Sequence, residues 1–161
     1  MSEVELTSEL VIAQISGMQD KKKSIDQFYR DYDNQYGDRD QNERRFRSVI
    51  DVINETFDGN LSDTEFSRVP LFYTIYCAIY HYQYGLPHLQ LNTPRKELSK
   101  AERLSLADAA QSLSDLINTG REGLPLRSDA EKFVRACLRQ TDNINPRRDR
   151  LTYFYEQAFG N

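Results

Sequence analysis

Three arginines near the carboxyl end carry the clearest chemical pattern in the sequence. Arg147, Arg148 and Arg150 follow Asn145-Pro146, a pair that is typical of the start of a helix. The free N–H groups at a helix start carry partial positive charge, so cations there need a negative partner. Together with Arg139, which ends the preceding predicted helix, these side chains form a candidate site for an anion or a nucleic acid.

The same arginines have a simpler interpretation, in which their negative partners come from within the chain. Asp142 and Asp149 are close in sequence, and the first half of the chain is acidic. Residues 1–80 contain nine basic and fifteen acidic side chains, whereas residues 81–161 contain twelve basic and ten acidic ones. Internal pairing is therefore the favoured interpretation, and an external anion should meet the second half of the chain.

Two cysteines and two histidines have the residue types of a zinc site. Cys77 and His81 share one face of a predicted helix, and His88 and Cys137 would complete a set of four ligands. The spacing matches no known zinc pattern, however, and a cysteine in an apolar helix is usually a core residue. A Cys–His nucleophile would also need a polar setting and a third group to orient the imidazole. We therefore predict no metal, no cofactor and no catalytic residue.

A stripe of tyrosines follows the most apolar segment of the chain. Tyr73, Tyr76, Tyr80 and Tyr84 recur at helical spacing. Their rings could stack on unpaired bases or anchor a partner helix. Tyrosine also suits a half-buried position in a bundle, with its hydroxyl at the rim, and packing is the favoured explanation. Tyr73, Tyr76 and Tyr80 are nevertheless the candidate partner surface.

The elements that must position these residues are all predicted to be helices. Apolar residues recur at helical spacing between caps, glycines and prolines, and no segment alternates as a strand does. The predicted helices cover approximately residues 6–17, 20–33, 40–57, 70–85, 99–120, 128–138 and 145–159. Asp20 and Asp40 are candidate caps, and Ser99 and Ser128 begin candidate capping boxes. The fold class is all-α, a bundle of six or seven helices around a central apolar helix over residues 69–84.

Composition excludes several classes of protein. With 29% charged and 39% hydrophobic residues, the chain is neither a disordered tail nor a membrane protein. The apolar stretch from Val69 to Tyr84 is shorter than the roughly 18–20 residues needed to span a bilayer. The acidic amino terminus is unlike a secretory signal, and the two cysteines suit reduced thiols. We therefore expect a single cytoplasmic helical domain over residues 1–161.

Several segments, taken together, are similar to one family. Three lie in the first part of the chain: Glu9-Leu10-Val11-Ile12-Ala13 leading into residues 19–26, then residues 69–73, then Tyr80-His81 followed by residues 84–87. The stretch from Arg135 to Arg150 resembles the closing segment of the same family. The chain thus resembles the carboxy-terminal helical half of the GmrSD-type, ParB-like restriction protein family.

The resemblance covers most of the chain and implies a role in assembly. Members of that family begin with a ParB-like domain, whose Asp-Gly-Gln-Gln-Arg motif is associated with nucleotide-dependent action, and some add an HNH nuclease. Neither part is present here, so no catalytic residue carries over. The chain is expected to be the second half of a split pair or a truncated reading frame.

Two functions from different classes follow. The first is a non-catalytic helical module of a restriction or phage-defence system, which docks on a ParB-like chain and contributes basic side chains to nucleic-acid contact. The second is a stand-alone interaction or regulatory domain without a nucleic-acid role, which the net charge of −4 slightly favours. An enzyme that uses His81 with Cys77 ranks last, because no orienting third group is evident.

Overall fold

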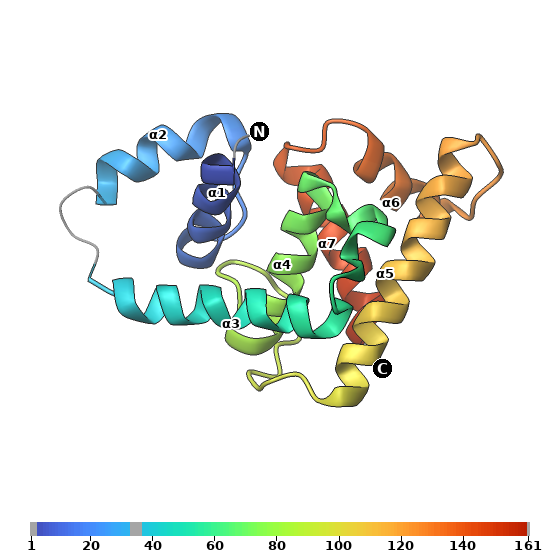
Figure 1. Cartoon of the computed structure of the whole chain (residues 1–161). Coiled ribbons are helices and arrows are strands. Elements are labelled where there is room, and N and C mark those ends of the chain that lie inside the picture. Colours follow the sequence, from blue (N-terminus) through green and yellow to red (C-terminus); the bar gives the residue numbers. More distant parts are fainter. Residues whose placement is uncertain (1–2, 33–36, 161) are drawn as a thin grey trace.

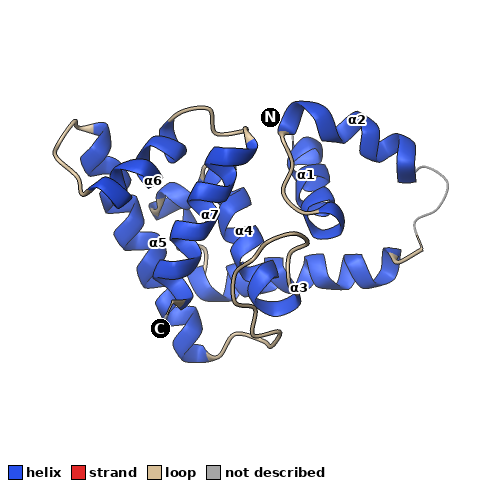
Figure 2. Ribbon diagram, turned by 180° about the vertical axis from the view of Figure 1, so that it is seen from behind, coloured by secondary structure: helices blue, strands red, loops and turns tan. Residues whose placement is uncertain are grey.

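The computed structural model describes residues 3–32 and 37–160, with only the backbone described for residues 21–24. Within these ranges every regular element is a helix, which confirms the predicted all-α class (Figure 1, Figure 2). The elements are α1 (Glu3–Ser16), α2 (Lys21–Tyr32), α3 (Arg39–Phe57), η1 (Asn60–Asp63), η2 (Glu65–Ser67), α4 (Val69–Tyr84), α5 (Lys100–Arg121), α6 (Ser128–Leu138) and α7 (Ile144–Phe159). The predicted end of the second helix at Asp33 lies outside the described residues.

Helix α4 forms the centre of the bundle, as its sequence predicts. All of its residues except Val69, Pro70, Phe72 and Tyr84 are buried. It packs against α1, α3 and α7, while α5 and α6 cover the other side of α7. Figures 1 and 2 show α1 and α2 on one side of α4, and α5 and α6 on the other. A helix that is apolar all round requires such enclosure by its neighbours.

The start of α5 confirms one predicted capping box. The Glu102 amide donates to Ser99 Oγ at 3.2 Å, and the Ser99 amide donates to Glu102 Oε2 at 2.7 Å. The Tyr82 hydroxyl also donates to Glu102, and Lys96 pairs with the same carboxylate at 2.9 Å. The hydrogen bond from Tyr82 is the main reason why the pKa of Glu102 falls to about 2. This carboxylate therefore joins the end of α4 to the start of α5.

Other predicted helix starts are corrected by the structure. Ser128 is the first residue of α6, and its N-cap is Arg127, which makes no capping hydrogen bond. Helix α3 begins at Arg39, so Asp40 lies inside it. Helix α7 begins at Ile144, whose amide donates to the Asp20 carboxylate at 2.6 Å. The cap of α7 comes from a distant part of the chain, which local spacing cannot reveal.

No helix in the two described ranges is long and apolar enough to cross a membrane.

The turn after α1 lies tightly against the loop that follows α4. Gly17 has a φ of +80°, and a Cβ atom built on it would lie 2.5 Å from the carbonyl oxygen of Pro87. Glycine is therefore required there for two reasons: its own backbone is left-handed, and the Pro87 carbonyl leaves no room for a side chain. This close approach holds α1 against residues 86–88.

Replacing Gly17 by alanine should lower the free energy of unfolding by about 2–5 kcal/mol, since left-handed backbone and overpacking both cost energy. The matched control is Gly59→Ala, because Gly59 has a φ of +81° and no heavy atom within 4 Å of the added Cβ. The free energy of unfolding of Gly59→Ala should fall only by the cost of the left-handed backbone, about 1–2 kcal/mol. Urea unfolding of both variants gives the comparison. Equal losses would show that the contact with Pro87 does not constrain the fold.

Candidate functional site

Arg147 is buried where α7 meets α1. Its Nη2 donates to Glu9 Oε2 at 2.5 Å, and the two side chains are only 4% and 3% exposed. Nη1 donates to the Gln19 carbonyl at 2.9 Å, and the guanidinium lies 4.3 Å above the centre of the Tyr73 ring. The Asp142 carboxylate is 3.7 Å away. The negative partner that a cation at a helix start requires is therefore internal.

Arg150 is completely buried and binds mainly to the backbone. Its Nη1 donates to the Ala136 carbonyl at 2.7 Å, and its Nη2 donates to the Thr141 carbonyl at 2.8 Å. Nε donates to Thr74 Oγ1 at 3.2 Å. Burial lowers the pKa of the Arg150 guanidinium to about 10, so it stays protonated at neutral pH. This one side chain joins α7 to α4, to α6 and to the connection between α6 and α7.

The structure corrects the anion site predicted from the sequence. Arg147 and Arg150 are buried among internal partners and cannot reach an external phosphate in this conformation. Arg139 and Arg148 are exposed, the first at the end of α6 and the second beside a shallow hollow that Tyr153 also lines. The four side chains therefore do not form one site. Anion binding by Arg139 and Arg148 stays a prediction.

The predicted tyrosine surface is also corrected. Tyr73, Tyr76 and Tyr80 are at most 3% exposed and belong to the core, in agreement with the packing interpretation. The Tyr76 hydroxyl donates to the Gln14 carboxamide, and the Tyr80 hydroxyl accepts from Arg45 Nη1 at 3.4 Å. Because α4 is enclosed on all sides, its stripe faces other helices of the same chain and not a partner.

The thiols and the buried imidazole are unsuited to catalysis. Cys77 and Cys137 are buried, and burial raises the pKa of each thiol to about 12. His81 Nδ1 accepts from the Leu86 amide at 3.0 Å, which leaves the proton on Nε2 to donate to the Leu91 carbonyl at 3.0 Å. Burial lowers the pKa of His81, in keeping with a neutral ring. Both ring nitrogens therefore organise the loop after α4.

The zinc set considered from the sequence does not form. His88 is exposed, whereas Cys77 and Cys137 are buried. Across residues 3–32 and 37–160, no three side chains of His, Cys, Asp or Glu gather as metal ligands would.

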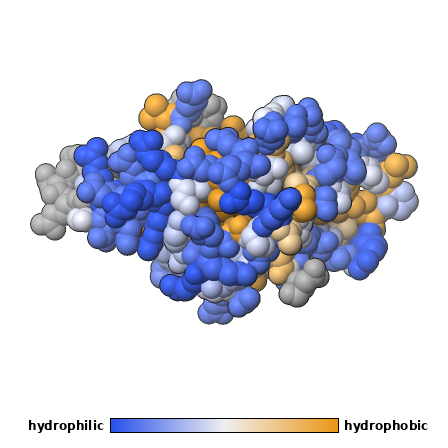
Figure 3. Space-filling model, turned by 60° about the horizontal axis from the view of Figure 1, so that its bottom comes forward, coloured by the Kyte–Doolittle hydropathy of each residue, from blue (hydrophilic) through white to orange (hydrophobic). Residues whose placement is uncertain are grey.

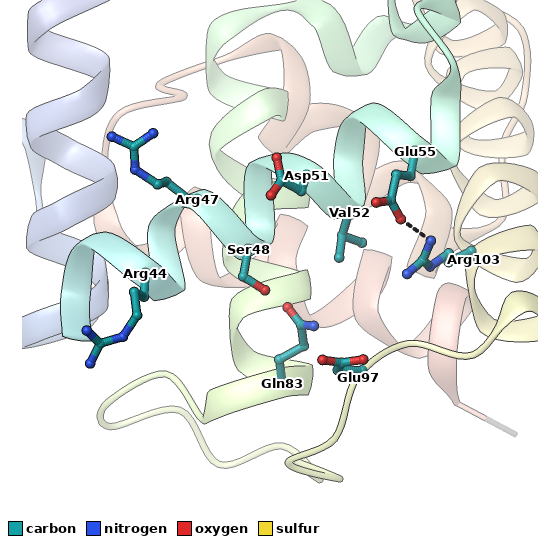
Figure 4. Close-up of a pocket in the computed structure, with 9 residues that line it drawn as sticks. All are labelled: Arg44, Arg47, Ser48, Asp51, Val52, Glu55, Gln83, Glu97 and Arg103. Atoms are coloured by element: carbon teal, nitrogen blue, oxygen red, sulfur yellow. Dashed lines mark hydrogen bonds and ion pairs between the residues drawn. The ribbon is translucent and has the colours of Figure 1, made fainter. Parts of the chain in front are cut away.

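A polar hollow lies between α3, the end of α4 and the start of α5 (Figure 4). Its volume is about 370 Å³. The side chains around it are mostly charged or polar: Arg44, Arg47, Ser48, Asp51, Val52, Glu55, Gln83, Glu97 and Arg103. We refer to this feature as the α3–α5 hollow. It brings together more charged and polar side chains than the hollow around residues 37–41 or the one beside Arg148.

The floor of the α3–α5 hollow contains a buried carboxamide. Gln83 is 5% exposed, and its Oε1 accepts no hydrogen bond in the described structure. Figure 4 shows the Gln83 side chain pointing toward Ser48, with Glu97 beside it. The Tyr84 hydroxyl donates to Ser48 Oγ at 3.0 Å, so this serine oxygen already serves as an acceptor. A buried oxygen without a donor is unusual in a folded protein and needs an explanation.

Sequence reasoning did not identify the α3–α5 hollow. The one available signal was Gln83, a polar residue inside the most apolar helix. Its neighbours come from α3, from the loop before α5 and from α5 itself, so only the fold brings them together. Arg47, one of the lining residues, binds Glu43 at 2.8 Å.

The described residues form an all-α domain with a buried arginine network and the polar α3–α5 hollow. Comparison of the chain with protein-family models, with curated proteins and with solved structures gave no significant match.

The two interpretations of the arginines predict opposite effects of substitution. Arg147→Ala should cost about 3–5 kcal/mol of unfolding free energy, because it leaves the buried Glu9 carboxylate without its cation. Arg148→Ala, at the exposed neighbouring position, should change stability by no more than about 0.5 kcal/mol. Thermal and urea unfolding of the two variants make the comparison. A stable Arg147→Ala variant would contradict the structural role.

Proposed function

We propose that this protein is a non-catalytic helical module of a restriction or phage-defence system and assembles with a ParB-like nucleotide-binding chain. The main support is the way in which the family-like segments meet. Glu9 and Gln19 from the first segments contact Arg147 from the closing one, and Tyr73 lies beneath its guanidinium. Three of the segments that carry the resemblance therefore contact one another around the Arg147 guanidinium.

A physical reason links that observation to the proposal. A buried ion pair constrains both partners and the helices that carry them, so such residues can be replaced only together. A chain that carries all of them is expected to adopt the same helical half as the family it resembles. The buried thiols and the engaged imidazole of His81 favour a binding role over a catalytic one.

Contact with nucleic acid would use only part of the predicted arginine set. With Arg147 and Arg150 in the interior, Arg139 and Arg148 are the members of the predicted set that a phosphate can reach. Two cations on a chain with a net charge of −4 provide only weak binding alone. The ParB-like chain would have to supply most of the contact.

The alternative is an interaction domain with no nucleic-acid role, and α2 provides an observation in its favour. Phe28 and Tyr32 stack with their ring centres 4.5 Å apart, and Tyr29 is 54% exposed. Helix α2 packs mainly on α1, which leaves Tyr29 open to a partner and Phe28 and Tyr32 half-buried. On the face shown in Figure 3, by contrast, hydrophilic side chains dominate.

The proposal predicts that the purified chain forms a stable complex with a ParB-like protein that carries the Asp-Gly-Gln-Gln-Arg motif and is encoded beside its gene. Light scattering after gel filtration measures the mass of the complex.

DNA binding by the complex should weaken steeply with salt. The double variant Arg139→Ala with Arg148→Ala should reduce the slope of log binding constant against log salt concentration by about 2. Arg30→Ala with Lys100→Ala, which also removes two exposed cations, is the matched control.

Two results would contradict parts of the proposal. Absence of a complex would favour the interaction domain with a different partner. A complex whose DNA binding responds equally to both double variants would retain the assembly role and remove the specific contact through Arg139 and Arg148.

A further inference from the structure

We propose that the α3–α5 hollow binds an alkylguanidinium or alkylammonium group, supplied by an arginine or lysine side chain of the partner chain. This inference rests on the proposed assembly function and names the contact through which the partner is recognised. It follows from the charges, the hydrogen bonds and the shape of the hollow.

The charges of the hollow leave an unbalanced acidic pair. Arg47 binds Glu43 at 2.8 Å, and Arg103 binds Glu55, so two of the three arginines are already neutralised. Arg44 and Arg47 point away from the centre in Figure 4. Asp51 and Glu97 have no ion-pair partner within the described residues. A cation that enters the hollow therefore meets two uncompensated carboxylates, and Arg44 is the one lining cation without an ion-pair partner among the described residues.

The hydrogen bonds add a second and independent indication. Gln83 Oε1 is a buried acceptor without a donor, beside the Ser48 hydroxyl and Glu97 (Figure 4). A ligand rich in N–H groups can satisfy this oxygen and the two carboxylates together, as guanidinium and ammonium groups do. A bare metal ion is disfavoured, because the described His, Cys, Asp and Glu side chains do not gather in threes.

The shape of the hollow favours a side chain over a free small molecule. Sites for small molecules are mostly apolar, with a few polar groups for orientation. Among the residues that line this hollow, Val52 is the only aliphatic one. Affinity for a free cation should therefore be low, and a larger protein surface around the hollow has to supply the rest.

The first arm of the test uses the isolated chain and small cations. Methylguanidinium at millimolar concentration should shift the NMR signals of the Gln83 carboxamide and of the Ser48 and Glu97 amides. Tetramethylammonium, which has the same charge but no N–H group, should not. The double variant Asp51→Asn with Glu97→Gln should weaken methylguanidinium binding about tenfold, because both ionic acceptors are lost. Asp108→Asn with Glu122→Gln removes two exposed carboxylates elsewhere and should leave binding unchanged.

Equal shifts with both cations would reveal nothing beyond charge screening and would overturn the proposal. Shifts with inorganic phosphate in place of methylguanidinium would overturn it as well.

The second arm uses the ParB-like chain and separates this inference from the proposed function. Asp51→Asn with Glu97→Gln should weaken the complex about tenfold relative to the Asp108→Asn with Glu122→Gln control. If the complex forms equally well with both double variants, assembly stands and the inference falls. If methylguanidinium binds as expected and no complex forms, the cation site stands and the proposed function falls.

Discussion

The whole arrangement depends on the burial of two guanidinium groups on α7. Removing a charged side chain from water costs several kcal/mol unless its donors find good acceptors. Arg150 finds them on the backbone around α4 and α6, and Arg147 finds them on Glu9 and Gln19. These requirements fix α1, α4 and α6 relative to α7. The apolar core packs α4 against the same neighbouring helices.

This constraint also shapes the function that the molecule can perform. Residues that would be suited to chemistry by type, such as Cys77, His81 and Arg147, are used to hold elements together. Under the proposed assembly role, the contacts with a partner lie in surface features that this frame leaves open. The α3–α5 hollow and the aromatic side chains of α2 are two such features, and both suit recognition of another protein.

Much of the fold could be predicted from local sequence, and the candidate site could not. Apolar periodicity indicates every helix, and the capping box at Ser99 locates the start of α5, because both signals act within a few residues. The start of α7 was misplaced since its cap, Asp20, is distant in sequence. The arginines near that start indicated only that a negative partner was needed. Tertiary packing alone determines that Glu9 supplies this partner and that Gln83 lies beside Glu97.

A double-mutant cycle on Glu9→Gln and Arg147→Met, with unfolding free energies from urea denaturation, measures how strongly this buried pair couples α1 to α7. We expect a coupling energy of at least about 1.5 kcal/mol, since the pair is buried and charge-assisted. The exposed pair of Glu43 and Arg47 serves as the control and should couple far more weakly. Additive effects of the two substitutions, within about 0.5 kcal/mol, would contradict the claim that this ion pair holds α1 on α7.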